Sequence, residues 1–185
     1  MWRTLLVKTP VWLLVFSLLL LPATSQASSK LEIDLFVQET LADFYKQSSA
    51  GRELASRAKG MLVFPKIYKA GFWVGGEYGE GALRIGGNTV GYYNIASASL
   101  GLQLGVQKKS QVILFMTDDA LQKFRNSQGW EAGVDGSVAI ANFGAAEEID
   151  TKTFQQPIIG FVFSNKGLMY NLTIEGAKIT PIQPR

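Results

Sequence analysis

The feature of this chain that most constrains its fold is an unbroken two-residue alternation over residues 96–107. Even positions hold apolar side chains, and odd positions hold glycine or small and polar side chains. Because successive side chains of a strand point to opposite faces, this pattern predicts a long, half-buried strand. Its small odd-numbered face would suit either an acyl-chain groove or close packing against another element, and we favour close packing.

Other segments read as strands too. Residues 111–116 form a nearly continuous apolar run, which indicates a strand covered on both faces, and residues 108–110 are expected to turn the chain into it as a hairpin. Residues 61–65 are expected to form a buried strand that Pro65 ends. The remaining expected strands, separated by turns at 165–167 and 175–176, are residues 134–143, 158–163, 168–174 and 177–182.

Three segments have helical patterns. Apolar residues recur at helical spacing from Ile33 to Phe44, after a capping box formed by Ser29 and Glu32, which predicts an amphipathic helix over residues 30–47. Its polar face is acidic. A second short helix is expected over residues 52–59, ended by Gly60. A third is expected over residues 117–126, with Asp118 and Asp119 at the positive end of its dipole.

Glycine is frequent, with 19 residues, and it is spread through the expected strands rather than gathered in a linker. Single glycines within strands mark bulges or close backbone approach. The sequence therefore predicts an α+β, β-rich fold. We expect a curved, mostly antiparallel sheet or a partly closed barrel, with amphipathic N-terminal helices, one short internal helix, and the helices on one side.

Residues 1–27 have the pattern of a cleavable secretory signal peptide. Arg3 and Lys8 form a basic start, residues 11–21 form an apolar core, and small residues precede a cleavage point after Ala27. That core is shorter than the ~20 residues of a membrane-spanning helix, so we favour cleavage over anchoring. The chain has no cysteine for lipidation. We expect one soluble mature domain, residues 28–185, in the periplasm or secreted.

The residue types that are missing limit the chemistry. With no histidine and no cysteine, the chain lacks catalytic triads, ordinary zinc sites and redox dithiols. The glycine-rich residues 75–81 fit neither the dinucleotide nor the phosphate-loop fingerprint, and we expect a hairpin there. No acidic run has calcium-loop spacing. We therefore expect no enzyme, no cofactor, no metal and no nucleotide. A carboxylate pair drawn from four acidic residues stays open as the minor alternative: Glu77, Glu80, Glu131 and Asp135.

Charge is unevenly distributed along the chain. The formal net charge is +3, and 16 basic against 15 acidic residues remain once the leader is removed. A near-neutral chain gives no reason to expect a nucleic-acid partner. Five basic side chains lie within residues 52–69 against Glu53 alone, whereas residues 118–150 hold seven acidic and two basic side chains. The domain is therefore predicted to be electrically polarised.

Long, ordered motifs resemble the SYLF lipid-binding domain family. They read AKGMLVFPK over residues 58–66, AGFWVGGEYGEG over 70–81, YYNI over 92–95 and GWEAGVDGS over 129–137. The resemblance continues through residues 111–117 and 157–173 and covers roughly residues 50–180. The chain is identified on these motifs as a bacterial, exported member.

The resemblance implies a lipid-binding module. Eukaryotic members bind phosphoinositide membranes through an amphipathic helix and basic residues, and some fungal members bind actin; for an exported bacterial chain we expect a phospholipid or anionic membrane surface and no actin. The acidic helix face departs from this pattern. The alternative is a structural or protein-interaction module. We expect electrostatic lipid binding, with an exposed tryptophan at the interface, by the following residues: Arg57, Lys59, Lys66, Lys69, Trp73 and Arg84.

Overall fold

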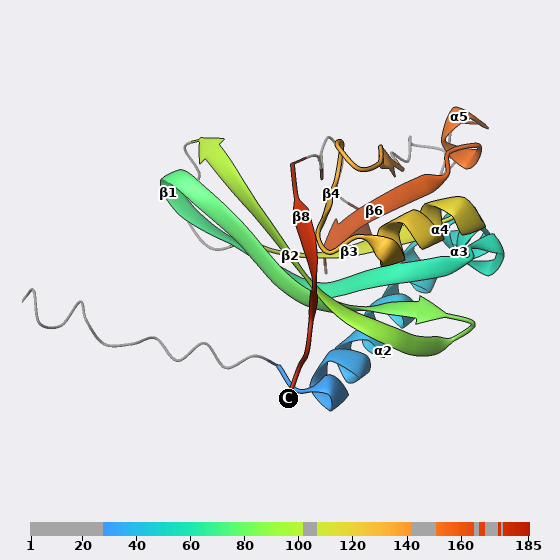
Figure 1. Cartoon of the computed structure of the whole chain (residues 1–185), viewed down its shortest axis with the longest axis horizontal. Helices are drawn as coiled ribbons and strands as arrows, with labels where there is room; N and C mark the ends of the chain where they lie inside the picture. Colours follow the sequence, from blue (N-terminus) through green and yellow to red (C-terminus); the bar gives the residue numbers. More distant parts are fainter. Residues whose placement is uncertain (1–27, 102–106, 142–150, 165–166, 169–173, 175) are drawn as a thin grey trace, which may run out of the picture.

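The computed structural model describes residues 28–101, 107–141, 151–164, 167–168, 174 and 176–185. Two helices open this part of the chain, α2 (Lys30–Gln47) and α3 (Ser49–Arg57). A strand-rich segment follows, interrupted by α4 (Asp118–Asn126) and α5 (Thr151–Phe154) (Figure 1). Among the described residues, no helix is both long and apolar enough to cross a membrane.

Serine N-caps determine where the two N-terminal helices begin. Ser29 Oγ accepts a hydrogen bond from the Glu32 amide at 3.2 Å, and the helix predicted over residues 30–47 is confirmed. The second helix begins earlier than expected, because Ser48 Oγ caps it by accepting from the Gly51 amide at 2.7 Å. Gly60 does not cap this helix. It starts the first strand, where a Cβ would lie 2.8 Å from Leu121.

The strands form one strongly curved sheet in the order β4-β8-β2-β1-β3-β6-β5, with β7 paired to β6. Within the described residues every pairing of strands is antiparallel except that of β5 with β6. The predicted α+β, β-rich fold class is confirmed. The strands are β1 (Gly60–Ile85), β2 (Asn88–Gly101), β3 (Gln107–Phe115), β4 (Trp130–Glu131), β5 (Ala139–Ile140), β6 (Ile158–Ser164), β7 (Gly167–Leu168) and β8 (Lys178–Ile182).

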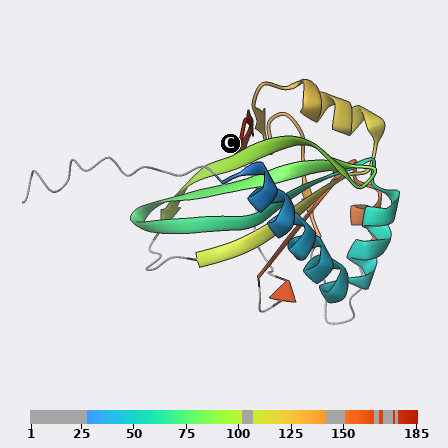
Figure 2. The ribbon, with the colours of Figure 1, turned by 90° about the horizontal axis from the view of Figure 1, so that it is seen from below.

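Strand β1 folds back on itself. Its 26 residues would span about 85 Å if straight, yet its first part pairs with β3 and its second part with β2. A Cβ at Gly79 would lie 2.6 Å from the Lys66 carbonyl oxygen, and one at Gly81 would collide with the Val63 carbonyl. The two parts therefore run side by side, as the returning ribbon in Figure 2 shows.

The course of β1 overturns two expectations. Pro65 does not end the strand but sits where the β1–β3 register shifts, which is a position that tolerates proline. Residues 75–81 belong to one arm of the hairpin of β1 with β2, as expected, and the tight turn of this hairpin is formed by Gly86 and Gly87 at φ 56° and 83°. The expected hairpin of β2 with β3 is wrong as well, because β1 lies between them and residues 108–110 belong to β3.

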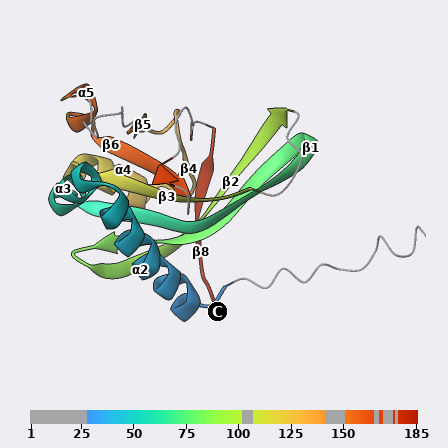
Figure 3. The same ribbon diagram turned by 180° about the vertical axis from the view of Figure 1, so that it is seen from behind.

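The sheet has a core on each face, so the expectation of helices on one side is wrong. Val112 and Leu114 of β3 pack with α2 and α3, whereas Ile113 and Phe115 pack with Leu121 and Phe124 of α4. The prediction that this strand is covered on both faces is confirmed. Figure 3 shows α2 crossing the sheet on the face opposite α4.

The third helix and the C-terminal strands are mostly where the sequence placed them. Thr117 caps α4, and β6 and β8 match the strands expected over residues 158–163 and 177–182. The strand expected over 134–143 is reduced to β5, because a turn closed by the Gly133 amide and the Gly136 carbonyl at 2.9 Å occupies its start. Most of residues 168–174, and residues 102–106 and 142–143, lie outside the described residues.

Candidate functional site

A groove of about 240 Å³ lies between α2 and β1, on the face of the sheet that α2 crosses. Helix α2 lines it on one side, and both parts of β1 supply most of the remaining lining residues. Because the walls come from the first helix and from both parts of the folded-back strand, the groove depends on the glycines that let β1 return. We call it the α2–β1 groove, and it is lined by Ser28, Glu32, Ile33, Phe36, Pro65, Lys66, Tyr68, Tyr78, Gly79 and Glu80.

Lys66 is the basic side chain inside this groove. Its Nζ lies 2.8 Å from the centroid of the Phe36 ring, a cation–π contact across the groove. Lys66 lies where the register of β1 with β3 shifts, between Phe64 and Ile67. Ser110 Oγ stabilises the backbone there by donating a hydrogen bond to the Pro65 carbonyl at 2.8 Å. Burial lowers the pKa of Lys66, and the charge of Lys108 lowers it further against the opposing effect of Glu32 and Glu39.

Glu80 forms the acidic end of the groove. Its Oε1 accepts a hydrogen bond from the Tyr78 hydroxyl at 2.9 Å, and its Oε2 accepts one from the Ser28 backbone nitrogen at 3.0 Å. Burial raises the pKa of Tyr78, and the hydrogen bond and charge of Glu80 raise it further. The carboxylate thus ties the start of α2 to β1.

Four large apolar or aromatic side chains are exposed on the two elements that form the groove, and of these Tyr68 and Tyr78 line it whereas Leu31 and Leu35 do not. Leu31 and Leu35 lie one turn apart on the solvent side of α2, with Leu31 80% exposed. Tyr68 and Tyr78 are each about half exposed on β1. We call Leu31, Leu35, Tyr68 and Tyr78 the groove rim. Exposed large apolar side chains on both elements of a groove make these elements a candidate interaction surface.

The acidic face of α2 is partly used for packing. Asp34 accepts hydrogen bonds from Thr89 Oγ1 at 2.7 Å and from the Tyr92 hydroxyl at 2.9 Å, which fix the helix to β2. Burial raises the pKa of Tyr92, with a further contribution from Asp34. Asp34 is therefore not a solvent-facing charge as the amphipathic pattern indicated.

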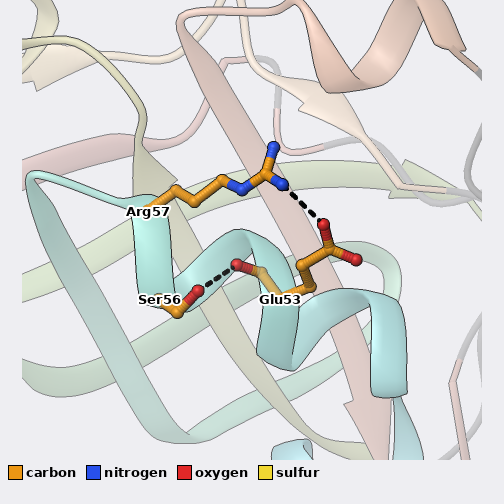
Figure 4. A network of polar contacts seen from close by, with 3 residues as sticks. All are labelled: Glu53, Ser56 and Arg57. Atoms are coloured by element: carbon orange, nitrogen blue, oxygen red, sulfur yellow. Dashed lines mark hydrogen bonds and ion pairs between the residues drawn. The ribbon is translucent and has the colours of Figure 1, made fainter.

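Two of the predicted lipid-binding residues lie away from the groove in exposed ion pairs. Arg57 donates to Glu53 at 2.8 Å within α3, where the Ser56 hydroxyl also bonds the Glu53 carbonyl (Figure 4). Lys59 Nζ lies 3.6 Å from Asp118. Both charges already have acidic neighbours, and neither lines the groove.

Lys69 lies on the opposite face of the sheet from Lys66. Its Nζ is 3.7 Å from Glu77, which also binds Lys109 at 2.6 Å. Lys109 lies on the same face of β3 as Gln111 and Ile113, and Ile113 belongs to the α4-side core. The side chains of Lys109 and Glu77 are 11% and 15% exposed. We call Lys69, Glu77 and Lys109 the β-face ion cluster.

The last two predicted residues lie at the two ends of the second part of β1. Arg84 donates to the Gly87 carbonyl at the β1–β2 turn, and its charge acts on Tyr45 and Tyr92. Trp73 pairs with Gly101 through its backbone, and its side chain is outside the described part of the chain. Of the five predicted residues whose side chains the structure describes, Lys66 alone lines the groove, and the joint role of the six stays a prediction.

Sequence reasoning missed most of the groove. Leu31 and Leu35 fall four residues apart and off the apolar stripe from Ile33 to Phe44, so a solvent-facing leucine pair was readable in the sequence. Lys108 pairs with Tyr68 across β1 and β3 and lay in a segment that we expected to be a turn. No local sequence pattern indicates that Tyr78 and α2 line the same groove.

The acidic residues considered for catalysis do not converge. Glu77 and Glu80 are three residues apart in β1, and they point to opposite faces. Asp135 accepts from the Glu131 amide at 2.6 Å in the turn after β4. Within the described ranges, no three acidic side chains come close enough together to hold a metal ion.

Comparison with known proteins gives one family. Residues 96–183 match the Ysc84 family model, described as Las17-binding protein actin regulator. The match spans β2 from Ala96 onward and the strands that follow, and the resemblance predicted from the motifs is confirmed. The α2–β1 groove precedes the matched region. No curated protein matches the chain.

Proposed function

Because residues 96–183 match the model of the family described as Las17-binding protein actin regulator, and the motifs resemble the SYLF family, we propose that the chain is a binding module that attaches to phospholipid bilayer surfaces. The family is one of binding domains. The single observation that carries the proposal is the groove rim, in which exposed leucines of α2 and half-exposed tyrosines of β1 lie on the two elements that form the groove around Lys66.

The rim has the composition of an interfacial contact. Moving a leucine side chain out of water is favourable by roughly 25 cal/mol per Å² of apolar surface that is buried. Tyrosine side chains favour the level of the lipid headgroups. Leu31 and Tyr68 are exposed, so this surface is available without unfolding. We infer that apolar insertion at the rim supplies most of the membrane affinity.

Electrostatic attraction contributes less to the membrane affinity than we expected from the basic segment of residues 52–69. Arg57, Lys59 and Lys69 each have an acidic partner, whereas Lys66 lines the groove and the charge of Lys108 acts on it. Each basic group near an anionic bilayer contributes about 1 kcal/mol, but Glu32 and Glu80 line the same groove and oppose it. A modest decrease of affinity with salt is therefore expected.

We place this activity in the bacterial cell envelope. The support is the leader pattern of residues 1–27, which delivers the mature chain to the periplasm or to the exterior. An anionic phospholipid surface is then the expected partner. In that compartment we expect no actin, nucleotide or nucleic acid to be bound, and no reaction to be catalysed.

A protein-interaction module is the second candidate. The family description names a protein-binding actin regulator, and exposed leucines on a helix also suit a protein groove. The two candidates differ in what they bind: a bilayer takes up the rim without any protein partner, whereas a protein-interaction module leaves pure lipid vesicles unbound.

Vesicle flotation with residues 28–185 tests the proposal. The parent should float with vesicles that contain anionic phospholipid, and Leu31→Ser with Leu35→Ser should reduce the bound fraction at least tenfold, because two apolar insertions are lost. Val134→Ser is the matched control, since Val134 is 75% exposed and lies outside the groove. Equal flotation of the double variant and the control, or no flotation of the parent, contradicts the proposal.

A further inference from the structure

Ser28, which precedes α2, makes a backbone contact with β1 that the proposed function does not use. The Ser28 backbone nitrogen, an amide in the uncut chain, donates to Glu80 Oε2 at 3.0 Å. The same carboxylate accepts the Tyr78 hydroxyl at 2.9 Å, so both of its oxygens are engaged. Ser28 and Glu80 are both partly buried at the edge of the α2–β1 groove.

The expected cleavage point falls at this nitrogen. Hydrolysis of the Ala27–Ser28 peptide bond by the endopeptidase of the export machinery consumes one water, leaves a carboxylate on Ala27, and turns the Ser28 amide into an α-ammonium group at neutral pH. We propose that the groove edge formed by Glu80 and Tyr78 is a receptor for the new amino terminus of the processed chain, which Ser28 occupies as an ion pair.

Charge around Ser28 favours the processed form. An ammonium group at the start of a helix faces the positive end of the helix dipole, which disfavours it unless a carboxylate lies beside it. Glu80 from β1 and Glu32 from the first turn of α2 line the groove with Ser28, while Lys66 is the basic group there and Tyr68 and Tyr78 complete its titratable lining. A hydrogen bond between charged groups is roughly twice as strong as a neutral one.

The consequence is that processing tightens the fold around the groove. In the uncut chain Ser28 holds Glu80 by a neutral amide, and after processing it does so by an ion pair. Both core clusters lie between Ile33 and Ile179, so a chain that begins at Ser28 keeps the whole core and can be studied alone. The inference rests on the proposed export, but its test involves no lipid.

The experiment compares two chains that both begin with serine. One starts at Ser28, and the other starts at Ser25, which moves the ammonium group about 10 Å along the chain. Glu80→Gln is introduced into each. At pH 6.5 the substitution should lower the Tm of the Ser28 chain by about 2–4 °C more than that of the Ser25 chain. Glu53→Gln is the control, and it should affect both chains equally because Glu53 pairs with Arg57 in α3 and does not line the groove.

The pH dependence identifies the group. The pair raises the folded pKa of the α-amine above its ordinary 7.7–8.0, so its stabilisation is present below that range and is lost as the pH rises through the folded pKa. The extra Tm loss should therefore vanish at pH 10, and an NMR titration of the Ser28 amine should report the raised pKa only with Glu80 present. Equal Tm losses in both chains at pH 6.5, an unshifted amine pKa, or an exported protein that begins at another residue overturns the inference.

Discussion

At the scale of single residues, the same residue type has different roles in different parts of this chain. Lys66 lies over the Phe36 ring in the groove, whereas Lys69, three residues later, belongs to the β-face ion cluster with Glu77. Composition showed a basic segment, but strand alternation divides it between two faces of the sheet. A charge count therefore could not locate the binding residues, since their partners come from segments distant in sequence.

The β-face ion cluster should be structural. Glu77→Gln leaves Lys69 and Lys109 without their carboxylate at side chains that are 22% and 11% exposed, and we expect it to lower the free energy of unfolding by about 1–3 kcal/mol. Urea denaturation at pH 7 measures this. Glu53→Gln removes a comparable ion pair to Arg57 at an exposed site and should change the stability little. Similar losses in both variants would show that the cluster contributes no more than a surface pair.

Four tyrosines should make the fold sensitive to alkali. Burial raises the pKa of Tyr45, Tyr78, Tyr92 and Tyr93 above the ordinary value of 10. As the pH rises, these tyrosines therefore ionise in the unfolded chain before they ionise in the folded chain. Their contribution to the free energy of unfolding is fully present below pH 10 and is lost as the pH rises through the folded pKa values. Denaturation midpoints between pH 8 and 11.5 test this, and Tyr92→Phe should flatten the fall. A parent midpoint that stays constant up to pH 11.5 would contradict it.

At the scale of elements, the fold was predictable where local signals were strong. The caps at Ser29 and Thr117 fixed α2 and α4, and the apolar run of β3 indicated its cover on both faces. The return of β1 was not predictable, because it depends on Gly79 and Gly81 meeting backbone about 15 residues away. The groove went unrecognised for the same reason, since its walls meet only after that return.

The return of β1 gives a sharp prediction about two glycines. A Cβ at Gly81 would collide with the Val63 carbonyl, so Gly81→Ala should destabilise the fold by about 1–3 kcal/mol or prevent folding. Gly76 in the same strand has only an ordinary 3.7 Å contact to the Ser97 carbonyl, so Gly76→Ala should be tolerated. Thermal unfolding followed by circular dichroism distinguishes them. A Gly81→Ala chain as stable as the Gly76→Ala chain would refute the close approach.

At the scale of the whole molecule, one sheet separates two cores and leaves one apolar surface uncovered. The α4 side is filled by Phe124 and Trp130, whereas the α2 side buries Phe44 against Phe161 and Phe163 and keeps the groove rim in water. Under the proposed function, this distribution makes the α2 side the expected contact with a bilayer.

A site-specific fluorescence measurement tests that contact most directly. The chain has no cysteine, so Leu31→Cys and Val134→Cys each give one attachment point for an environment-sensitive dye. With vesicles that contain anionic phospholipid, we predict a blue shift and quenching by lipid-borne quenchers for the dye at residue 31, and no change at residue 134. Identical responses at both positions, or none at residue 31 while the protein is bound, would contradict the assignment of the α2 side as the membrane surface.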